Sequence, residues 1–418
     1  MLSPDLVTLV FALVLLAGLL LRLWLATRQV RHVMRNRAVV PADFVATIAL
    51  ASHQKAADYT VAKARFGMAD MAWSAAIVLG WTLLGGLDAL NAALGAVGVE
   101  GMARQVALVA VFSLVGAVLD MPASLYQNFV LERRFGFSRM TVSQWMRDVM
   151  LTGVLAAVVG LPVVWVILWL MGAAGSAWWF HAWLLWVGFN LLLLVIYPTV
   201  IAPLFNRFEP LDDPALRDRV LALMQRCGFS AKGLFVMDGS KRSAHSNAYF
   251  TGFGRSKRVV FYDTLLARLS PPEVDAVLAH ELGHFRHRHV YKRMVSLFLF
   301  SLVGFALLGW LSNQPAFFLG LGVRPQLGEP NDALALLLFL MVAPLFGLFV
   351  SPLFASASRR HEFEADAFAM TQTGSAALRS ALLKLYEDNA STLTPDPLFV
   401  RFYYTHPPAS QRLARMAH

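Results

Sequence analysis

Residues 332–366 read DALALLLFLMVAPLFGLFVSPLFASASRRHEFEAD, and the character of the chain changes sharply within them. From 332 to 357 the side chains are almost all apolar, and the run is long enough to cross about 30 Å of hydrocarbon as a helix. From Ser358 onward charged residues dominate, with one histidine and three carboxylates among the last six positions. The stretch predicts a membrane span that leads directly into a segment of reactive side chains.

Apolar runs of similar length recur along the chain. Its 418 residues are 57% hydrophobic and 15% charged, whereas soluble domains have about 45–50% and about 25%. This composition excludes a disordered chain and an ordinary soluble enzyme, and the single Cys227 excludes an intrachain disulfide. Seven runs are long enough to span a membrane, at residues 6–26, 71–94, 105–131, 149–174, 177–205, 294–312 and 332–357. We therefore expect a mainly α-helical, polytopic membrane protein with seven transmembrane helices.

The spans divide the chain into four parts. We expect five spans in 1–205, a polar catalytic segment in 206–293, two spans in 294–357 and a polar C-terminal segment in 358–418. The first span is expected to be an anchor rather than a cleaved signal, because the residues before it carry an acid and no positive charge.

Basic residues alternate between the loops. They are abundant after the first and third spans and scarce in the loops after the second and fourth. The positive-inside rule then predicts an N-terminus outside, and both polar segments and the C-terminus in the cytoplasm. The membrane would be the inner membrane of a bacterium or the endoplasmic reticulum of a eukaryote. The Lys/Arg bias of the cytoplasmic loops accounts for the formal charge of +10, so no nucleic-acid partner is expected. The expected partner is the lipid bilayer, and the oligomeric state stays open.

The first polar segment contains the H-E-x-x-H pattern at His280, Glu281 and His284. Ser270 and Glu273 form a predicted capping box, with Pro271 at the first helical position, so a helix begins just before the pattern. Residues four apart share one helical face, so the two imidazoles can hold one zinc ion with the carboxylate of Glu281 beside them. His287 and His289 do not complete a longer ligand pattern, and we expect them on a solvated basic face.

A catalytic zinc needs a third protein ligand and an open position for water. Glu362 and Asp366 are four residues apart, so Glu362 can bind the metal while Asp366 accepts the outward N–H of a ligand histidine. Glu364 is turned about 160° away on a helix and is expected to have little effect on the site. His361 remains an alternative ligand. A helix stop is expected at Gly374.

Several motifs together resemble the type I CAAX prenyl proteases, a family of integral-membrane zinc metallopeptidases that has bacterial members. The resemblance covers nearly the whole chain and rests on FVLE at 129–132 with Gly136 and Phe137, GSKRSAHSNAYF at 239–250, HELGH at 280–284, EFEADAFA at 362–369, and HPP at 406–408 with Arg412.

This resemblance implies a fold and a set of roles. It implies seven spans around a chamber, with a zincin-like α+β catalytic portion on the cytoplasmic side and one Zn²⁺ per chain. It makes Glu362 the third ligand, Asp366 the partner of a ligand histidine and Glu281 the base. His406 would lie at the oxyanion, and substrate would be bound by Asn247, Tyr249 and Arg412.

The residues around Asn247 suggest how an extended peptide would be held. Residues 247–252 and 258–262 are rich in β-formers and are joined by Gly254 to Lys257, which predicts a small hairpin with an edge free to pair with substrate. The expected function is hydrolysis of peptide bonds in a peptide or protein substrate, possibly prenylated. Two alternatives stay open: a heat-shock type of membrane zinc protease, which is shorter with fewer spans, and a transporter stabilised by a structural metal.

Overall fold

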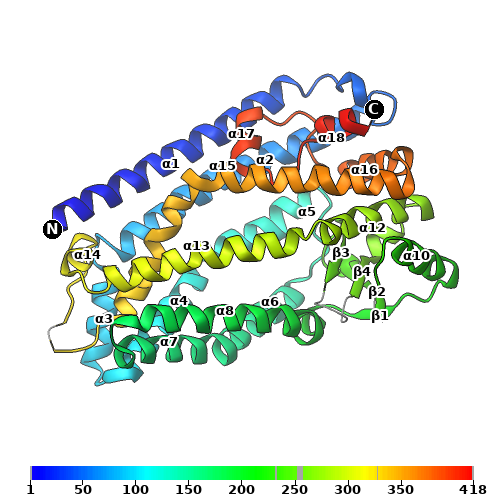
Figure 1. The fold of residues 1–418 in the computed structure, drawn as a ribbon. Helices are drawn as coiled ribbons and strands as arrows, with labels where there is room; N and C mark the ends of the chain where they lie inside the picture. Colours follow the sequence, from blue (N-terminus) through cyan, green and yellow to red (C-terminus); the bar gives the residue numbers. More distant parts are fainter. Residues whose placement is uncertain (1, 231–232, 252–257, 327, 417–418) are drawn as a thin grey trace.

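The computed structural model describes all residues except 1, 231–232, 252–257, 327 and 417–418. Long helices lie side by side along most of the molecule, and a small sheet with shorter helices sits at one end (Figure 1). The N-terminus lies at the opposite end from the sheet, and the C-terminus lies on the sheet side.

Six unbroken helices among the described residues are long and apolar enough to cross a membrane. Some of them are composites with short π-helical or 3-10 stretches. In order they are α1 (Pro4–Arg35), α4 (Gly101–Tyr126) extended by α5 (Glu132–Arg134), α6 (Val142–Leu155) with α7 (Leu161–Ala173), α8 (Trp178–Ile196) with α9 (Ala202–Phe205), α13 (His289–Leu311) and α15 (Asp332–Thr373).

The span predicted at 71–94 is divided in the structure. It consists of α2 (Leu50–Trp81) and α3 (Gly86–Ala96), which meet at a bend of 49°, so the total is seven spans when this pair counts as one. Glycine permits the bend: Gly85 has φ +79°, and a Cβ at Gly86 would lie 2.6 Å from the Gly80 carbonyl oxygen. The prediction of seven spans is confirmed on that count, and the second span is a bent pair of helices.

The last span does not end where its apolar run ends. α15 continues through Pro344 and Pro352 and past residue 357 to Thr373, a length of 42 residues or about 63 Å. It stops at Gly374, whose φ is +83°, as the sequence predicts. The two carboxylates of interest, Glu362 and Asp366, therefore lie on the same helix that spans the membrane.

The sheet has four strands in the order β1 (Phe208–Pro210), β2 (Gly233–Met237), β4 (Arg258–Tyr262) and β3 (Ala248–Thr251). β3 and β4 pair antiparallel, which confirms the predicted hairpin strands, while the predicted turn falls on residues outside the described ranges. β3 stands at the edge of the sheet. β1 and β2 add two strands that the sequence did not predict, because each is short and carries no clear alternation of apolar and polar residues.

Shorter helices pack against the sheet and against the end of α15. They are α10 (Pro214–Arg226), α11 (Asp263–Leu266), α12 (Pro271–Arg286), α16 (Ser375–Asp388), α17 (Pro397–Tyr403) and α18 (Ala409–Met416), while α14 (Pro315–Gly320) lies at the far end near the N-terminus (Figure 1). One hydrophobic core forms between the sheet, α12 and α16, around Phe261, Leu265 and Leu278. A second forms among the spans, around Leu87, Leu168 and Leu338.

The C-terminal segment is fastened to the first span. Asp396, whose side chain is 3% exposed, forms an ion pair of 3.0 Å with Arg28 of α1, and its backbone N–H donates to Gln29 Oε1 at 2.7 Å. Ser52 of α2 donates to Glu387 at 2.8 Å. The residues after α15 are thereby held against the N-terminal spans.

Candidate active site

Helix α12 presents the H-E-x-x-H residues. It begins with the predicted capping box, in which Ser270 N–H donates to Glu273 at 2.7 Å, and this expectation is confirmed. Its residue Gly283 allows close contact with α15, because a Cβ there would lie 2.9 Å from Ala365 Cα. This approach brings the histidines of α12 to the carboxylates of α15.

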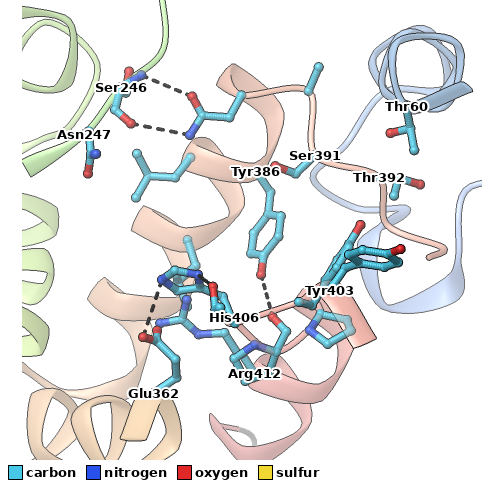
Figure 2. Close-up of a pocket in the computed structure, with 18 of the residues that line it drawn as sticks. Thr60, Ser246, Asn247, Glu362, Tyr386, Ser391, Thr392, Tyr403, His406 and Arg412 are labelled. Carbon is cyan, nitrogen blue, oxygen red and sulfur yellow. Dashed lines mark hydrogen bonds and ion pairs between the residues drawn. The ribbon is translucent and has the colours of Figure 1, made fainter. Parts of the chain in front are cut away.

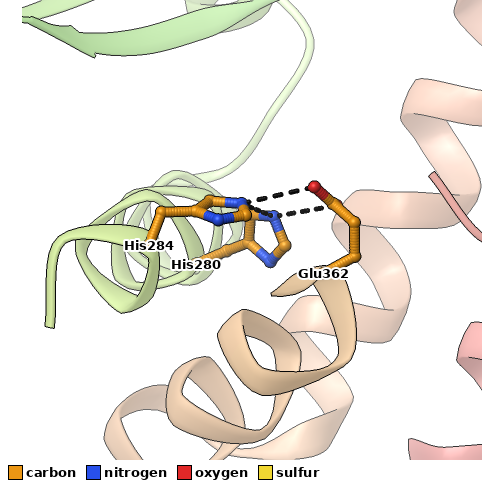
Figure 3. A group of neighbouring side chains, drawn as sticks. All are labelled: His280, His284 and Glu362. Atoms are coloured by element: carbon orange, nitrogen blue, oxygen red, sulfur yellow. Dashed lines mark hydrogen bonds and ion pairs between the residues drawn. The ribbon is translucent and has the colours of Figure 1, made fainter. Parts of the chain in front are cut away.

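The structure brings His280, His284 and Glu362 together (Figure 3). His280 Nε2 lies 3.4 Å from Glu362 Oε2, His284 Nε2 lies 3.4 Å from Glu362 Oε1, and the two Nε2 atoms are 3.3 Å apart. Ligands about 2.0–2.1 Å from a tetrahedral ion stand about 3.3–3.4 Å from one another. The two imidazole nitrogens and the Glu362 carboxylate, which turns one oxygen toward each of them, are therefore spaced about as ligands of one tetrahedral metal ion are.

Hydrogen bonding also favours a cation at this point. His280 Nδ1 lies 2.9 Å from Asp366, and a carboxylate can only accept, so Nδ1 carries the proton and Nε2 presents a lone pair. Glu362 is 4% exposed, and its Oε2 atom is buried without a hydrogen-bond partner. Lone pairs that converge in a buried place need a positive charge between them. The residues thus fit a bound metal ion.

Asp366 is itself held by Arg412. The guanidinium donates from Nε to Asp366 Oδ2 at 2.8 Å and from Nη2 to Oδ1, and Arg412 is only 6% exposed. Its Nη2 also lies 3.5 Å from His280 Nδ1. Arg412, expected to bind substrate, is thus directed mainly at the partner of a ligand histidine.

One expectation about neighbouring residues is wrong. His289 is 3% exposed rather than solvated, and its Nδ1 lies 2.9 Å from His284 Nδ1. Glu364 points away from the three donors, as expected, but it bonds His289 Nε2 at 2.8 Å and so touches the site through that histidine. His287 is exposed, as predicted. His361 lies outside the three-ligand group and stacks on His289 with ring centroids 4.0 Å apart.

A cavity of about 760 Å³ adjoins the three donors. Glu281, His406, Asn247 and Arg412 line it, together with His280, Glu362 and residues of α1 and α2 such as Ala26, Gly67 and Met71. Figure 2 shows Glu362, His406 and Arg412 near one another, with Ser246 and Asn247 on another wall. The cavity is therefore bounded by the catalytic end and by membrane helices together.

Glu281 and His406, the two predicted catalytic residues, have different surroundings. Burial raises the pKa of the Glu281 carboxyl above its usual range, an effect opposed by His280 and His284. The His406 side chain is 66% exposed, and its Nε2 lies 3.4 Å from Glu362 Oε1. A proton-accepting carboxylate and an accessible imidazole therefore stand beside the three donor atoms.

The predicted substrate-binding residues Asn247 and Tyr249 lie directly before β3 and within it. Asn247 is exposed in the cavity wall, whereas Ala248 and Phe250 point into the core. Tyr249 lies on the same side as Asn247, because side chains alternate along a strand, but its ring packs against Tyr262 at 6.3 Å. Tyr249 is not among the residues that line the cavity.

Sequence reasoning missed two residues of the cavity wall. The Tyr386 hydroxyl donates to the Pro407 carbonyl at 3.0 Å, next to His406, and burial raises the pKa of this phenol so that it stays a donor. Asn389 Oδ1 accepts from Ser246 N–H at 3.1 Å (Figure 2). No local motif marks either residue, because their partners lie far away in sequence.

Two protein-family models match the chain. The model described as "CAAX prenyl protease N-terminal, five membrane helices" matches residues 29–207, and that of peptidase family M48 matches residues 210–418.

Curated relatives and a solved structure agree with these matches. The CAAX prenyl protease 1 homolog of Arabidopsis thaliana is 38% identical over 71% of this chain and 69% of its own length. For CAAX prenyl protease 1 of Saccharomyces cerevisiae the identity is 33%, over 76% and 73% of the two chains. The Mus musculus homolog is 30% identical over 97% and 94%. The crystal structure of S. mikatae Ste24p superposes with a TM-score of 0.93 at 28% identity and covers 99% of both chains.

The comparisons confirm the resemblance seen in the motifs and do not favour the two alternatives. The match to the five-helix N-terminal model goes against a shorter heat-shock type, and the peptidase match goes against a transporter. Membership in a metallopeptidase family also implies a catalytic metal. The chain belongs to peptidase family M48 and, within it, to the CAAX prenyl proteases, so it is a multi-pass membrane metalloprotease.

Proposed function

We propose that this protein is a zinc endopeptidase that cleaves close to the C-terminus of prenylated peptides. The observation that carries the proposal is one cavity lined by His280 and Glu362 of the three-residue group, by Glu281 and by apolar residues of the membrane helices. The relatives are named as CAAX prenyl proteases, and the apolar wall of Ala26, Gly67 and Met71 offers this chain a place for a prenyl group.

Each ligand and its support has a proposed role. His280, His284 and Glu362 would hold one Zn²⁺, and the bound ion would supply Lewis acidity and make a water molecule more acidic. Asp366 keeps the His280 proton on Nδ1, so that Nε2 stays free to bind. Arg412 keeps Asp366 in place, and we propose that it positions this carboxylate rather than a substrate group.

The proton transfers fall to Glu281. Its carboxylate accepts a proton from water as the scissile carbonyl is attacked and returns it to the leaving amine. His406, exposed beside Glu362, would donate to the oxygen on which negative charge develops. Tyr386 holds the Pro407 carbonyl and thus the segment that carries His406.

Substrate would lie extended along β3. This edge strand has an unpaired side on which a peptide can add as a further strand, and Asn247 begins it at the cavity wall. Tyr249, on the same face, would contact substrate residues farther along the strand.

The distribution of charge supports a topology for this activity. We propose that the N-terminus is outside and that 206–293 and 358–418 face the cytoplasm, in agreement with the four-part division of the chain. The membrane would be the bacterial inner membrane or the endoplasmic reticulum.

Cleavage of matched peptides tests the proposal. The purified protein, in detergent, would be incubated with a farnesylated peptide ending in a CAAX sequence and with its unprenylated twin, and the products identified by mass spectrometry. We expect cleavage of the farnesylated peptide near its C-terminus, its loss on chelation, and recovery with added zinc. Equal cleavage of both peptides would refute the preference for prenylated substrates, and activity that resists chelation would refute the metal.

A further inference from the structure

We propose that His289 and Glu364 form a hydrogen-bonded relay that positions His284 for metal binding. The inference rests on the ligand set of the proposed function and adds two residues to it. It parallels the support that Asp366 gives to His280, but it passes through a second imidazole.

Two short contacts define the relay. Glu364 Oε2 lies 2.8 Å from His289 Nε2, and His289 Nδ1 lies 2.9 Å from His284 Nδ1. An ionised carboxylate only accepts, so His289 carries its proton on Nε2 and presents a lone pair on Nδ1. That lone pair can only meet a proton on His284 Nδ1. The Nε2 atom of His284 is then left with its lone pair, and this is the atom that lies 3.4 Å from Glu362.

The backbone places His289 for this contact. Helix α12 ends at Arg286, and Arg288 takes the left-handed conformation with φ +57° before α13 starts at His289. A non-glycine residue rarely adopts this conformation, so the surrounding structure must hold it there. The turn sends the chain back toward α12, and His289 meets the residue five positions before it.

The surroundings of His289 restrict its ring. The side chain is 4% exposed and lies between His287 and His361, with ring centroids 5.6 Å and 4.0 Å away and planes within 15° and 13°. A ring held between two parallel rings has little freedom to rotate. His289 can therefore fix the orientation of the His284 imidazole as well as its tautomer.

Metal affinity tests the relay independently of peptide cleavage. Full-length protein would be stripped of metal and titrated with zinc against a competing chelator. We expect His289→Leu, which fills similar space without an acceptor, to weaken zinc binding about 10- to 100-fold. His289→Asn, which offers an acceptor oxygen near the position of Nδ1, should recover most of this loss. The control His181→Ala removes an exposed histidine of α8 that takes no part in the relay, and this variant should bind zinc as the unmodified protein does.

The outcomes separate the relay from other roles. A role in packing alone predicts that leucine is tolerated better than asparagine, and that order, or equal affinity of His289→Leu and the unmodified protein, would overturn the proposal. If His289→Leu fails to fold, Glu364→Ala serves instead, since Glu364 is 45% exposed; it should lose affinity several-fold, and unchanged affinity would overturn the relay. If Glu362→Ala retained zinc, the proposed ligand set of His280, His284 and Glu362 would be wrong.

Discussion

Three carboxylates of this site have different partners. Glu362 faces two imidazole nitrogens, Asp366 faces an imidazole nitrogen and a guanidinium, and Glu281 lines the cavity. In the proposed function, these partners rather than the residue type determine whether a carboxylate binds metal, holds a ligand or transfers a proton.

The base can be separated from the ligands by a single substitution. Glu281→Gln keeps the shape and all three ligands but removes the proton acceptor. We expect zinc content per chain to stay near that of the unmodified protein, while turnover falls about 10²-fold or more. Cleavage at a near-normal rate would contradict the role given to Glu281. Glu209→Gln changes an exposed carboxylate far from the cavity and serves as the matched control.

A substitution at Arg412 tests whether this residue positions Asp366 or binds substrate. Arg412→Lys keeps the charge but loses the two-point contact with Asp366, so zinc affinity and kcat should fall together. The ratio of KM values for peptides with a free and an amidated C-terminus should not change. A selective loss of the preference for the free carboxylate would instead show that Arg412 contacts substrate.

At the scale of the element, the contact between α12 and α15 decides whether the ligands meet. Gly283→Ala places a methyl group 2.9 Å from Ala365 Cα and 3.1 Å from its carbonyl oxygen, so the helices must separate. We expect weaker zinc binding and a loss of stability of about 1–3 kcal/mol. Gly347→Ala, on α15 and with open space around its Cβ position, should leave zinc binding unchanged. Normal zinc affinity in Gly283→Ala would show that the site does not depend on this close approach.

The start of α12 gives the catalytic end a dependence on pH. Burial raises the pKa of Glu273, but bonds from Lys384 at 2.8 Å, Ser380 at 2.6 Å and Ser270 outweigh it and lower the pKa to about 2. A lowered folded-state pKa contributes stability above the ordinary value of 4.5, and this contribution is lost as the pH falls from about 4.5 to about 2. Glu273→Gln should therefore lower Tm by a few degrees at neutral pH, with a smaller difference near pH 2. Thermal unfolding at a series of pH values measures this, and a constant difference down to pH 2 would contradict it.

The sequence predicts those features of the site that depend on residues close together in the chain. The capping box and the four-residue spacings depend on residues within one or two turns, so α12, the faces of His280 and His284 and the pairing of Glu362 with Asp366 all follow from sequence. The left-handed turn at Arg288 interrupts that regularity, and the position of His289 could not be obtained from helical spacing. Tyr386 and Arg412 act on residues 21 and 46 positions away, which only the packed structure brings near.

For the whole molecule, the distribution of charge predicts which side of the membrane carries the chemistry. A reporter fused after His418 should behave as cytoplasmic, because the basic loops flank the same side as the residues that follow α15. A paired fusion before Met1 should report the opposite side. Equal accessibility of both fusions from the outside would reverse the proposed topology.

Helix α15 contains both the last membrane span and Glu362, and this arrangement has a consequence for biosynthesis. Because a chain is made from its N-terminus, His280 and His284 are synthesised before the last two spans, whereas Glu362, Asp366 and Arg412 follow the apolar part of α15. While these spans are still entering the membrane, the third ligand has not reached the histidines. The unfinished protease therefore has no complete centre with which to cut neighbouring nascent proteins, or itself, at the translocation site.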